Sequence, residues 1–517
     1  MTFEIVFVLL SLLGMVAALI ADKMRPGMIL FSVVVLFLCA GILTPKEMLE
    51  GFSNKGMITV ALLFLVSEGI RQSGTLGQVI KKLLPQGKTT VFKAQLRILP
   101  SVAFISAFLN NTPVVVIFAP IIKHWAKSVN LPATKFLIPL SYVTILGGIC
   151  TLIGTSTNLV VYGMILEAGF EGFSMFELGK VGIFIAIAGI IYIFLFSKRL
   201  LPDARPDTAV PDEEVEEGEK LHRVEAVLGA RFPGINKKLK DFNFQRHYGA
   251  EVKEIKTRNG QRFVSNLEEV VLHEGDTLVV MADDTFIPTW GESSVFVLLT
   301  NGNEPDTTGK KKRWFALLLL VLMIVGATVG ELPVTKEMFP DIKLDMFFFV
   351  SITTIIMAWT NLFPARKYTK YISWDILITI ACAFAISKAM VNSGVADSVA
   401  KFIIGLSDDY GPHVLLAMVF IITNLFTELI TNNAAAALAF PLALSISAQL
   451  GVSPTPFFVV ICMAASASFS TPIGYQTNLI VQGIGNYKFT DFVRIGLPLN
   501  IITFLISVIL IPLIWNF

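Results

Sequence analysis

Two short polar stretches interrupt long apolar runs of the sequence, and each consists of residue types that can bind ions. The first, TLIGTSTNLVVYG, covers residues 151–163, and the second, TPIGYQTNLIVQG, covers residues 471–483. They share eight of thirteen positions at an offset of 320 residues (471 − 151), which indicates an internal duplication. We expect Gly154–Asn158 and Gly474–Asn478 to be the unwound centres of two discontinuous helices. Exposed carbonyls and Asn, Thr and Ser oxygens suit a hard cation such as Na⁺, and half-helix N-termini suit an anion.

Two pairs of asparagines interrupt other apolar runs in the same way, in the stretches LNNTP and ITNNA. Asn111 of the first stretch lies 47 residues before Asn158 (158 − 111), and Asn432 of the second lies 46 residues before Asn478 (478 − 432). Because these separations nearly match, we expect each repeat to bring one hairpin tip to one helix break. A lone asparagine in a membrane helix often only joins two helices. Four of them in a duplicated pattern favour a binding site.

The composition indicates the medium that surrounds these stretches. The chain has 517 residues, of which 54% are hydrophobic and only 15% are charged, and its mean hydropathy is +0.70. Soluble domains carry about 25% charged residues. We therefore predict an α-helical polytopic membrane protein. The four cysteines and five histidines lack metal-ligand spacing, and no nucleophile is paired with a base, so we expect no enzyme and no catalytic residues.

Apolar runs of about 20 residues predict ten full spans, five in each half of the chain. These lie near residues 3–20, 27–43, 57–73, 136–165, 178–198, 314–331, 345–363, 375–391, 457–483 and 495–515. Two more apolar stretches, 96–122 and 412–447, contain the asparagine pairs. They predict re-entrant hairpins, because non-helical backbone at membrane depth must be enclosed by protein or line a watery cavity.

The distribution of basic residues predicts the orientation of these spans. Five short loops on one side hold sixteen Lys and Arg (two, six, three, three and two), whereas the opposite side holds about six. By the positive-inside rule, the basic side faces the cytoplasm across the cell inner (plasma) membrane. Both termini are then extracytoplasmic, and residues 203–312 are cytoplasmic.

The duplication extends beyond the polar stretches. Residues 61–84 align with residues 381–404, again at an offset of 320 (381 − 61). Five spans and one hairpin in each orientation form an inverted repeat, which is typical of secondary transporters. We predict a first transmembrane repeat over 1–202, an inserted segment over 203–312 and a second transmembrane repeat over 313–517.

The inserted segment differs in composition from the rest of the chain. It opens with PDARPDTAVPDEEVEEGEK, an acidic, proline-containing run that is typical of a flexible linker. A turn at Asn259-Gly260 and a second at Gly275-Asp276 before the run Thr277–Val280 predict a small α+β unit. This unit resembles the C-terminal lobe of potassium-uptake regulatory proteins, the TrkA-C or RCK-C type. The resemblance implies two alternatives, a lobe that binds a regulatory nucleotide and a lobe that only braces a dimer.

The paired patterns of the membrane portion resemble the divalent anion/sodium symporter family, the sodium-coupled sulfate and dicarboxylate transporters. Members carry a Ser-Asn-Thr motif at each hairpin tip and a Gly-Thr break in the following helix. Here the tips read Asn110-Asn111-Thr112 and Thr431-Asn432-Asn433. The resemblance implies a homodimer in the lipid membrane that moves sodium and a small anion by an elevator-like shift. It implies no nucleic-acid partner.

The resemblance also assigns site residues. The implied sodium ligands are Asn110, Asn111, Gly154, Thr431, Asn432 and Gly474. The implied substrate contacts are Asn111, Thr112, Thr157, Asn158, Asn432, Asn433, Thr477 and Asn478. Sodium is the only metal ion implied.

Departures from the family pattern bear on the substrate. Dicarboxylate members continue each tip with Ala-Thr-Thr, whereas the tips here continue Pro113-Val114-Val115 and Ala434-Ala435-Ala436. Loss of these hydroxyls removes donors for a long dicarboxylate. The forms GTSTN and GYQTN are closer to sulfate-transporting members of algae and cyanobacteria. We expect sulfate, with a dicarboxylate such as succinate or malate as the alternative. A ligand-gated ion channel is a less favoured hypothesis, because no repeated selectivity filter is present.

Overall fold

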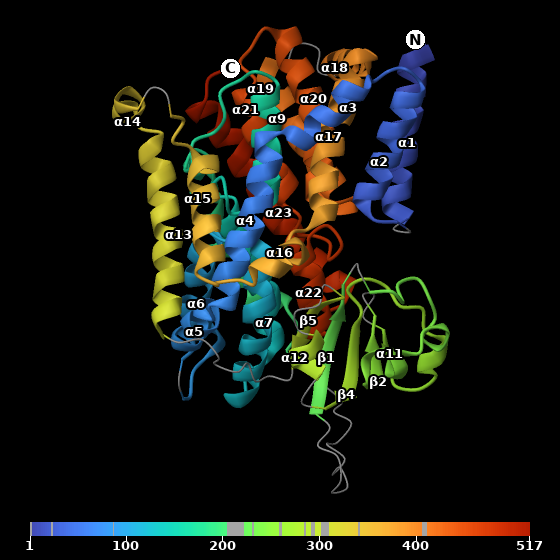
Figure 1. The fold of residues 1–517 in the computed structure, drawn as a ribbon, viewed down its shortest axis with the longest axis vertical. Helices are drawn as coiled ribbons and strands as arrows, with labels where there is room; N and C mark the ends of the chain where they lie inside the picture. The colour runs from blue at the N-terminus through green and yellow to red at the C-terminus, as the bar shows by residue number, and fades with distance from the viewer. Residues whose placement is uncertain are drawn as a thin grey trace, which may run out of the picture.

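Helices make up most of the described chain, and a small sheet-containing lobe lies at one end of them (Figure 1). The computed structural model describes residues 3–21, 24–85, 87–203, 222–229, 232–257, 261–283, 286–290, 295–300, 310–339, 342–405 and 411–517. Residues 204–221 of the predicted acidic linker and the predicted turn at Asn259-Gly260 lie outside the described residues.

Eight helices of the described chain are long and apolar enough to cross a membrane. Six correspond to predicted spans, and these are Phe3–Ala21 (α1), Pro45–Gln72 (α3, Pro45–Glu50, with α4, Lys55–Gln72), Gly179–Leu200 (α10), Lys311–Gly330 (in α13, Lys310–Gly330), Trp374–Asn392 (α17) and Phe489–Ile514 (α23). The other two, Gly411–Leu429 (α19) and Asn432–Leu450 (α20), are the legs of the second predicted hairpin.

Four of the ten predicted full spans are therefore not single long helices. α2 (Pro26–Cys39) and α15 (Met346–Trp359) have 14 residues each. The predicted spans 136–165 and 457–483 are each divided by a break, as the polar stretches within them predict. The chain is nevertheless a multi-pass membrane protein by the length and composition of its helices.

The elements of the first half recur in the second half in the same order. The bounds of α2 and α15 differ by 320 residues at both ends (346 − 26 and 359 − 39). The last residues of α4 and α17 also differ by 320 (392 − 72), and the pair after them is α5 (Thr75–Leu83) and α18 (Val395–Gly405). In Figure 1, α1 runs from the N-terminus toward the lobe, whereas α13 runs away from the lobe to α14 (Pro333–Met338). Opposite directions are typical of an inverted repeat, which stays a prediction.

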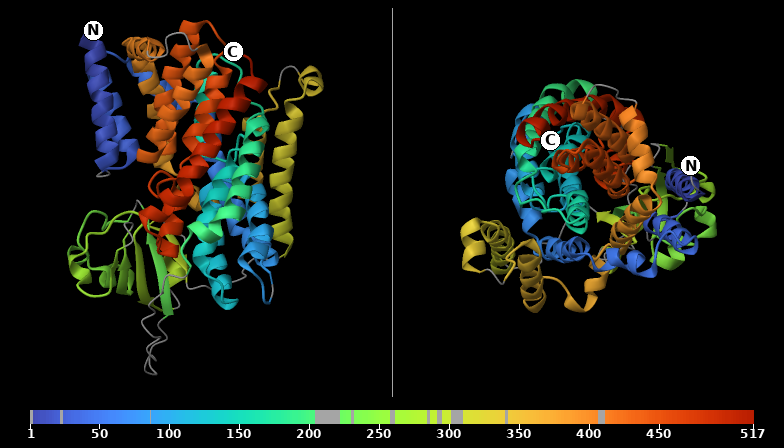
Figure 2. Two further views of the ribbon diagram at one scale, coloured as in Figure 1. Left: turned by 180° about the vertical axis from the view of Figure 1, so that it is seen from behind. Right: turned by 90° about the horizontal axis from the view of Figure 1, so that it is seen from above.

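Two helical hairpins approach the middle of the body from opposite ends. The first consists of α6 (Val91–Ser106) and α7 (Asn111–Ser128), and its outer end lies on the side of the lobe (Figures 1 and 2). The second consists of α19 and α20, and its outer end lies on the far side. Both hairpins are longer than the predicted stretches 96–122 and 412–447, because their outer turns continue into less apolar sequence.

Each hairpin is followed by a broken helix. α8 (Leu137–Gly148) ends before a non-helical segment, and α9 begins at Ser156 and ends at Glu167. In the second half, α21 (Thr455–Ser466) ends and α22 (Gln476–Gly485) begins after a similar segment. Only the first two residues of each predicted centre, Gly154–Asn158 and Gly474–Asn478, lie in a non-helical segment. The last three residues of each centre are helical. Small polar residues favour the start of a helix, so these centres lie mainly in the first turns of α9 and α22.

The broken helices occupy the centre of the helical body. Every residue of α8 is buried, as is every residue of α21 after the first. Because the residues are buried on every face, protein and not lipid surrounds both helices. The hairpin helices α6 and α19 supply part of that surround, together with α10 and α23. The two breaks are therefore held deep inside the protein.

The lobe is a five-stranded antiparallel sheet with two short helices among its described residues. Its strand order is β3-β2-β4-β1-β5. The elements are β1 (His222–Leu228), α11 (Phe244–Tyr248), β2 (Glu251–Lys256), β3 (Arg262–Phe263), β4 (Thr277–Ala282), α12 (Phe286–Trp290) and β5 (Phe296–Thr300). Its own apolar core includes Phe232, Leu278 and Phe296. The run expected at Thr277–Val280 is therefore a strand; the resemblance of the lobe to a TrkA-C unit stays a prediction.

The close approach of α6 and α8 gives a test of this packing. A side chain at Gly147 would collide with the backbone carbonyl of Ala103, whereas one at Gly14 would meet nothing within 4 Å. We expect Gly147→Ala to destabilise the protein by about 1–3 kcal/mol through overpacking. Thermal unfolding in detergent should show a lower Tm for Gly147→Ala and no decrease for Gly14→Ala. Equal Tm values for the two variants would contradict the packing.

Candidate functional site

The first hairpin tip is joined to the first helix break through one threonine. The Thr151 hydroxyl donates to the carbonyl of Ala107 at the tip. The backbone N–H of Gly154 donates to the Thr151 hydroxyl at 3.2 Å, and the Asn158 amide donates to the Thr151 carbonyl at 2.9 Å. These bonds satisfy backbone groups that the broken helix leaves unpaired inside the membrane region.

The second repeat contains the same three bonds. The Thr471 hydroxyl donates to the carbonyl of Glu428 at 3.1 Å. The N–H of Gly474 donates to the Thr471 hydroxyl at 3.3 Å, and the Asn478 amide donates to the Thr471 carbonyl at 3.1 Å. Each repeat therefore brings one tip to one break, as the spacing of the asparagines predicts.

The tip asparagines are buried and held in equivalent ways. Asn111 is 1% exposed, and its amide lies 2.8 Å from the hydroxyl of Ser106, five residues earlier. Asn432 accepts a hydrogen bond from the hydroxyl of Thr427, also five residues earlier, at 2.8 Å. The orientation of the Asn111 amide that gives all its atoms complementary partners turns its nitrogen toward Ser106 and its oxygen toward the Tyr475 hydroxyl.

Four helices begin at this network. Their first residues are Asn111 (α7), Ser156 (α9), Asn432 (α20) and Gln476 (α22). Each helix N-terminus carries about half a positive charge and several backbone N–H groups without a helical partner. Such ends attract anions. The site therefore has a positive field without needing a basic side chain.

Side chains of the two repeats also meet each other across the site. The Thr112 hydroxyl, next to the first tip asparagine, donates to the Gln476 side-chain oxygen of the second break at 3.2 Å. In the opposite direction, the Thr157 hydroxyl of the first break donates to the Asn433 oxygen of the second tip at 3.2 Å. The tip of one repeat thus touches the break of the other repeat on both sides.

Two further predicted residues bond to α8 in the core. Thr477 and Asn478 are fully buried, and the Ser141 hydroxyl lies 2.8 Å from the Thr477 hydroxyl and 2.7 Å from the Asn478 side-chain oxygen. The structure therefore gathers most of the predicted site residues in one network. These are Asn111, Thr112, Gly154, Thr157, Asn158, Asn432, Asn433, Gly474, Thr477 and Asn478.

Two predicted sodium ligands lie at the edge of this network. Asn110 is half-buried before α7, makes no capping bond with its side chain, and faces a small cavity lined by apolar residues of α4 and α13. Thr431 is exposed before α20 and likewise makes no capping bond with its side chain. Their predicted roles, like those of the residues in the network, stay predictions.

Tyr475 is a central residue that the sequence patterns do not reveal. Its hydroxyl lies 2.5 Å from the Asn111 amide and 3.0 Å from the Thr155 hydroxyl, and it also bonds to Asn432. The phenol thus connects both tips. The only signal in the sequence is that the second break reads GYQTN where the first reads GTSTN.

Glu428 is a carboxyl residue that contacts the second break. It takes the place that Ala107 has in the first repeat, because each supplies the carbonyl that accepts from the break threonine. Its side chain accepts from the Asn500 amide at 2.7 Å and from the N–H of Ser470 at 2.9 Å. These bonds fix the second hairpin to α23, whereas Ala107 places no carboxyl group at the equivalent position of the first repeat.

Comparisons with known proteins assign this architecture to a family. A family model described as a citrate transporter matches residues 16–445 and 342–517. The chain belongs to the citrate transporter family. It is therefore a membrane transporter and not an enzyme.

Similar proteins include one that aligns with this chain over most of the length of both. An uncharacterised transporter of Synechocystis sp. is 30% identical over 94% of this chain and 93% of its own length. A probable sodium/sulfate cotransporter 3 of Chlamydomonas reinhardtii is 23% identical over 93% of this chain and 85% of its own length. Sodium/sulfate cotransporter 2 of the same alga is 31% identical over 54% of this chain and 31% of its own length.

Proposed function

We propose that this transporter is a sodium-coupled symporter that takes up a small divalent anion, with sulfate as the favoured substrate. The observation that carries the proposal is the meeting of four helix N-termini with two clusters of neutral oxygens. Helix N-termini supply a field for the anion, and neutral oxygens supply ligands for a hard cation. The relatives named as sodium/sulfate cotransporters support the same pair of solutes.

The first cation site would form where Gly154 lets backbone oxygens crowd together. A Cβ at Gly154 would lie 2.5 Å from the carbonyl oxygen of Gly148 and 3.0 Å from that of Ala107. Only glycine leaves this space free, and the side chain of Asn111 borders it. The repeated bonds around Gly474 and Asn432 support an equivalent second site.

Coupling would follow from the position of the tip asparagines. Asn111 and Asn432 stand between the oxygen clusters and the helix N-termini. A bound cation would turn the amide oxygen of each asparagine toward the oxygen cluster and leave the amide nitrogen to donate to the anion. Two bound sodium ions would add positive charge beside the anion and raise its affinity, because an ion is the largest local charge in such a site. A homodimer with an elevator-like movement, set in the plasma membrane with the lobe in the cytoplasm, completes the proposal.

The alternative substrate is a carboxylate. The family model is named for citrate, whereas the similar algal proteins are named for sulfate. The tips support the smaller anion, because Val114, Val115 and Ala435 supply no hydroxyl groups for a longer one. A ligand-gated channel would move the anion down its own gradient and would need no sodium.

We expect sulfate uptake to be driven by sodium. Proteoliposomes that contain the full chain should accumulate radiolabelled sulfate above equilibrium with an inward sodium gradient and should not do so when choline replaces sodium. Asn111→Ala and Asn432→Ala should each lower this uptake at least about ten-fold, because each removes a hydrogen bond to a charged solute.

Asn516→Ala is the matched control, since Asn516 is exposed near the end of the chain. It should transport like the wild type. Equal uptake from sodium and choline buffers would refute the coupling, and normal transport by both tip variants would refute the assignment of the tips. Uptake of succinate or citrate in place of sulfate would establish the alternative substrate.

A further inference from the structure

Tyr475 and Thr155 occupy equivalent places in the two repeats (475 − 155 = 320). Each is the residue that precedes the restarted helix, Thr155 before α9 and Tyr475 before α22. Their hydroxyls lie 3.0 Å apart. Two equivalent residues of a duplicated structure can touch only near the axis that relates the repeats. Tyr475 therefore lies at the centre of the candidate site.

The phenol fills a place that threonine leaves open on the other side. Tyr475 is 8% exposed, and its hydroxyl reaches the amides of both Asn111 and Asn432. A threonine hydroxyl is attached directly to Cβ, so it cannot span the same gap. The ring consequently takes up space between the helix N-termini where the anion would bind.

The hydroxyl can still serve a small anion. It has one proton to donate, which the Asn111 oxygen accepts in the present arrangement. An oxyanion that replaces Asn111 as the acceptor gains a short charge-assisted hydrogen bond. An extended dicarboxylate needs the volume that the ring occupies, and steric exclusion of this kind is a common source of specificity.

We propose that Tyr475 is the specificity-determining residue of the transporter, and that it restricts the site to compact tetrahedral oxyanions. This inference rests on the proposed function, since it concerns the substrate class of the same site. The second repeat would then select between substrates, because the first repeat carries only Thr155 at the equivalent place.

The test exchanges the tyrosine for the residue of the other repeat. In sodium-driven uptake assays, Tyr475→Thr should raise the KM for sulfate about ten-fold or more through loss of a hydrogen bond to a charged solute. Succinate should neither inhibit the wild type nor enter the proteoliposomes, and it should do both with Tyr475→Thr. Tyr475→Phe keeps the ring, so it should raise the KM for sulfate while succinate stays excluded.

Tyr487→Phe is the matched control. The Tyr487 side chain is fully buried, and its hydroxyl donates to the Thr134 carbonyl at 2.5 Å, away from the tips. The Tyr487→Phe variant should transport sulfate and exclude succinate, as the wild type does. Unchanged selectivity in Tyr475→Thr, or succinate entry in Tyr475→Phe, would overturn the inference while sodium-driven sulfate uptake by the wild type upheld the proposed function. Absence of sodium-driven uptake by the wild type would overturn both.

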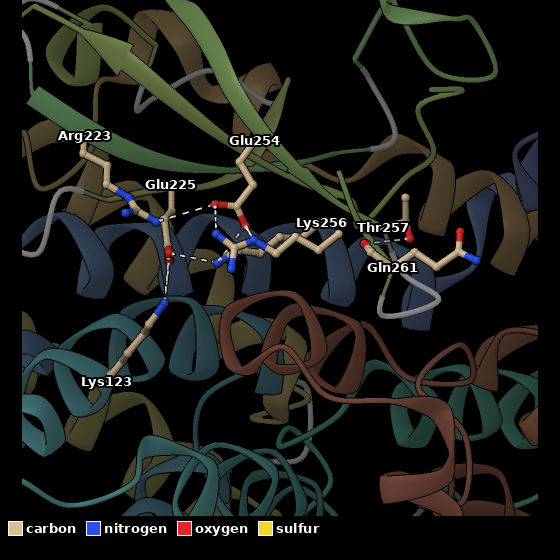
Figure 3. Close-up of polar contacts among 8 residues, drawn as sticks. Lys123, Arg223, Glu225, Glu254, Lys256, Thr257 and Gln261 are labelled. Atoms are coloured by element: carbon tan, nitrogen blue, oxygen red, sulfur yellow. Dashed lines mark hydrogen bonds and ion pairs between the residues drawn. The ribbon is translucent and has the colours of Figure 1, made fainter. Parts of the chain in front are cut away.

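A second inference comes from an independent contact, between the lobe and the helical body. The Lys123 ammonium, near the end of α7, lies 2.9 and 3.0 Å from the two carboxylate oxygens of Glu225 in β1 (Figure 3). Burial by itself would raise the pKa of Glu225, but Lys123, Lys256 and Arg223 outweigh it and lower the pKa to about 2. The carboxylate is therefore charged at physiological pH.

The charges continue across the sheet. Glu225 lies 3.5 Å from the Lys256 ammonium, and Glu254 on the same strand as Lys256 lies 3.8 Å from the Arg223 guanidinium (Figure 3). The Glu254 side chain is 2% exposed. A buried ion pair that loses one partner leaves an uncompensated charge, which is strongly destabilising. The lobe therefore has a defined docking position on α7.

The lobe also rests on α22. Gly275 lies in the left-handed region (φ +84°), and a Cβ there would be 2.5 Å from the Leu479 side chain. Thr277 lies against Gly483 of the same helix. The lobe thus touches the two helices that begin at the first tip and at the second break. The sequence suggests a lobe that a flexible linker couples only weakly; the described contacts indicate direct coupling.

We infer that the lobe clamps α7 to α22 and so controls how readily the part of the transporter that carries the site can move. A clamp affects transport only if it docks more tightly in one state of the transporter than in another. This inference concerns rate and not substrate choice. It holds for any solute that the site carries.

A double-mutant cycle tests the clamp. Lys123→Met and Glu225→Gln should each change the maximal uptake rate several-fold in the same direction, and the double variant should match the single variants, because both remove one interaction. Lys127→Met, an exposed change one turn along α7, should leave the rate unchanged. Lys123→Met lies outside the lobe and leaves the lobe interior unchanged. If Glu225→Gln fails to fold, the uptake rate of Lys123→Met alone tests the clamp. A wild-type rate for Lys123→Met, or additive effects in the cycle, would overturn the clamp.

Discussion

Backbone groups left unpaired by a broken helix must find partners inside the protein, and this constraint shapes the whole membrane portion. Thr151 and Thr471 meet it in the same way, each by linking a break to a hairpin tip. The hairpins must enter from opposite ends to supply those tips. The burial of α8 and α21 follows, since both breaks have to lie deep in the body. The candidate ion site is thus a consequence of how the breaks are stabilised.

The two repeats have the same backbone arrangement around the site but differ in some of the side chains that they place there. Both repeats supply a threonine, a glycine and an asparagine in the same geometry. Two of the differences between them place Tyr475 and Glu428 opposite Thr155 and Ala107. The frame gives four converging helix N-termini and two oxygen clusters, and the two exceptional residues lie in the second repeat. The proposed specificity of the site is therefore set by the second repeat.

The sequence predicts the frame well and the exceptions poorly. The duplication, the hairpins and the meeting of tips with breaks follow from repeated polar residues in apolar runs. The bounds of the breaks do not, because residues such as Thr157 and Asn158 start a helix as readily as they interrupt one. Tyr475 is missed because an aromatic residue in an apolar run carries no pattern. The docking of the lobe through Lys123 is not predicted, because a single basic residue at the end of an apolar run is explained equally well by the positive-inside rule.

The central claim is that the tip of one repeat meets the break of the other. Thr112 and Gln476 lie on these two elements, 3.2 Å apart between side-chain oxygens. A Thr112→Cys/Gln476→Cys protein, with the four native cysteines replaced, measures this contact in membranes with a short bifunctional methanethiosulfonate cross-linker, which spans the length that Gln476→Cys removes. The account predicts a cross-link that blocks transport, forms more slowly with sodium and sulfate present, and restores transport on reduction. Failure of the pair to cross-link, although each cysteine alone reacts with a maleimide, would contradict it.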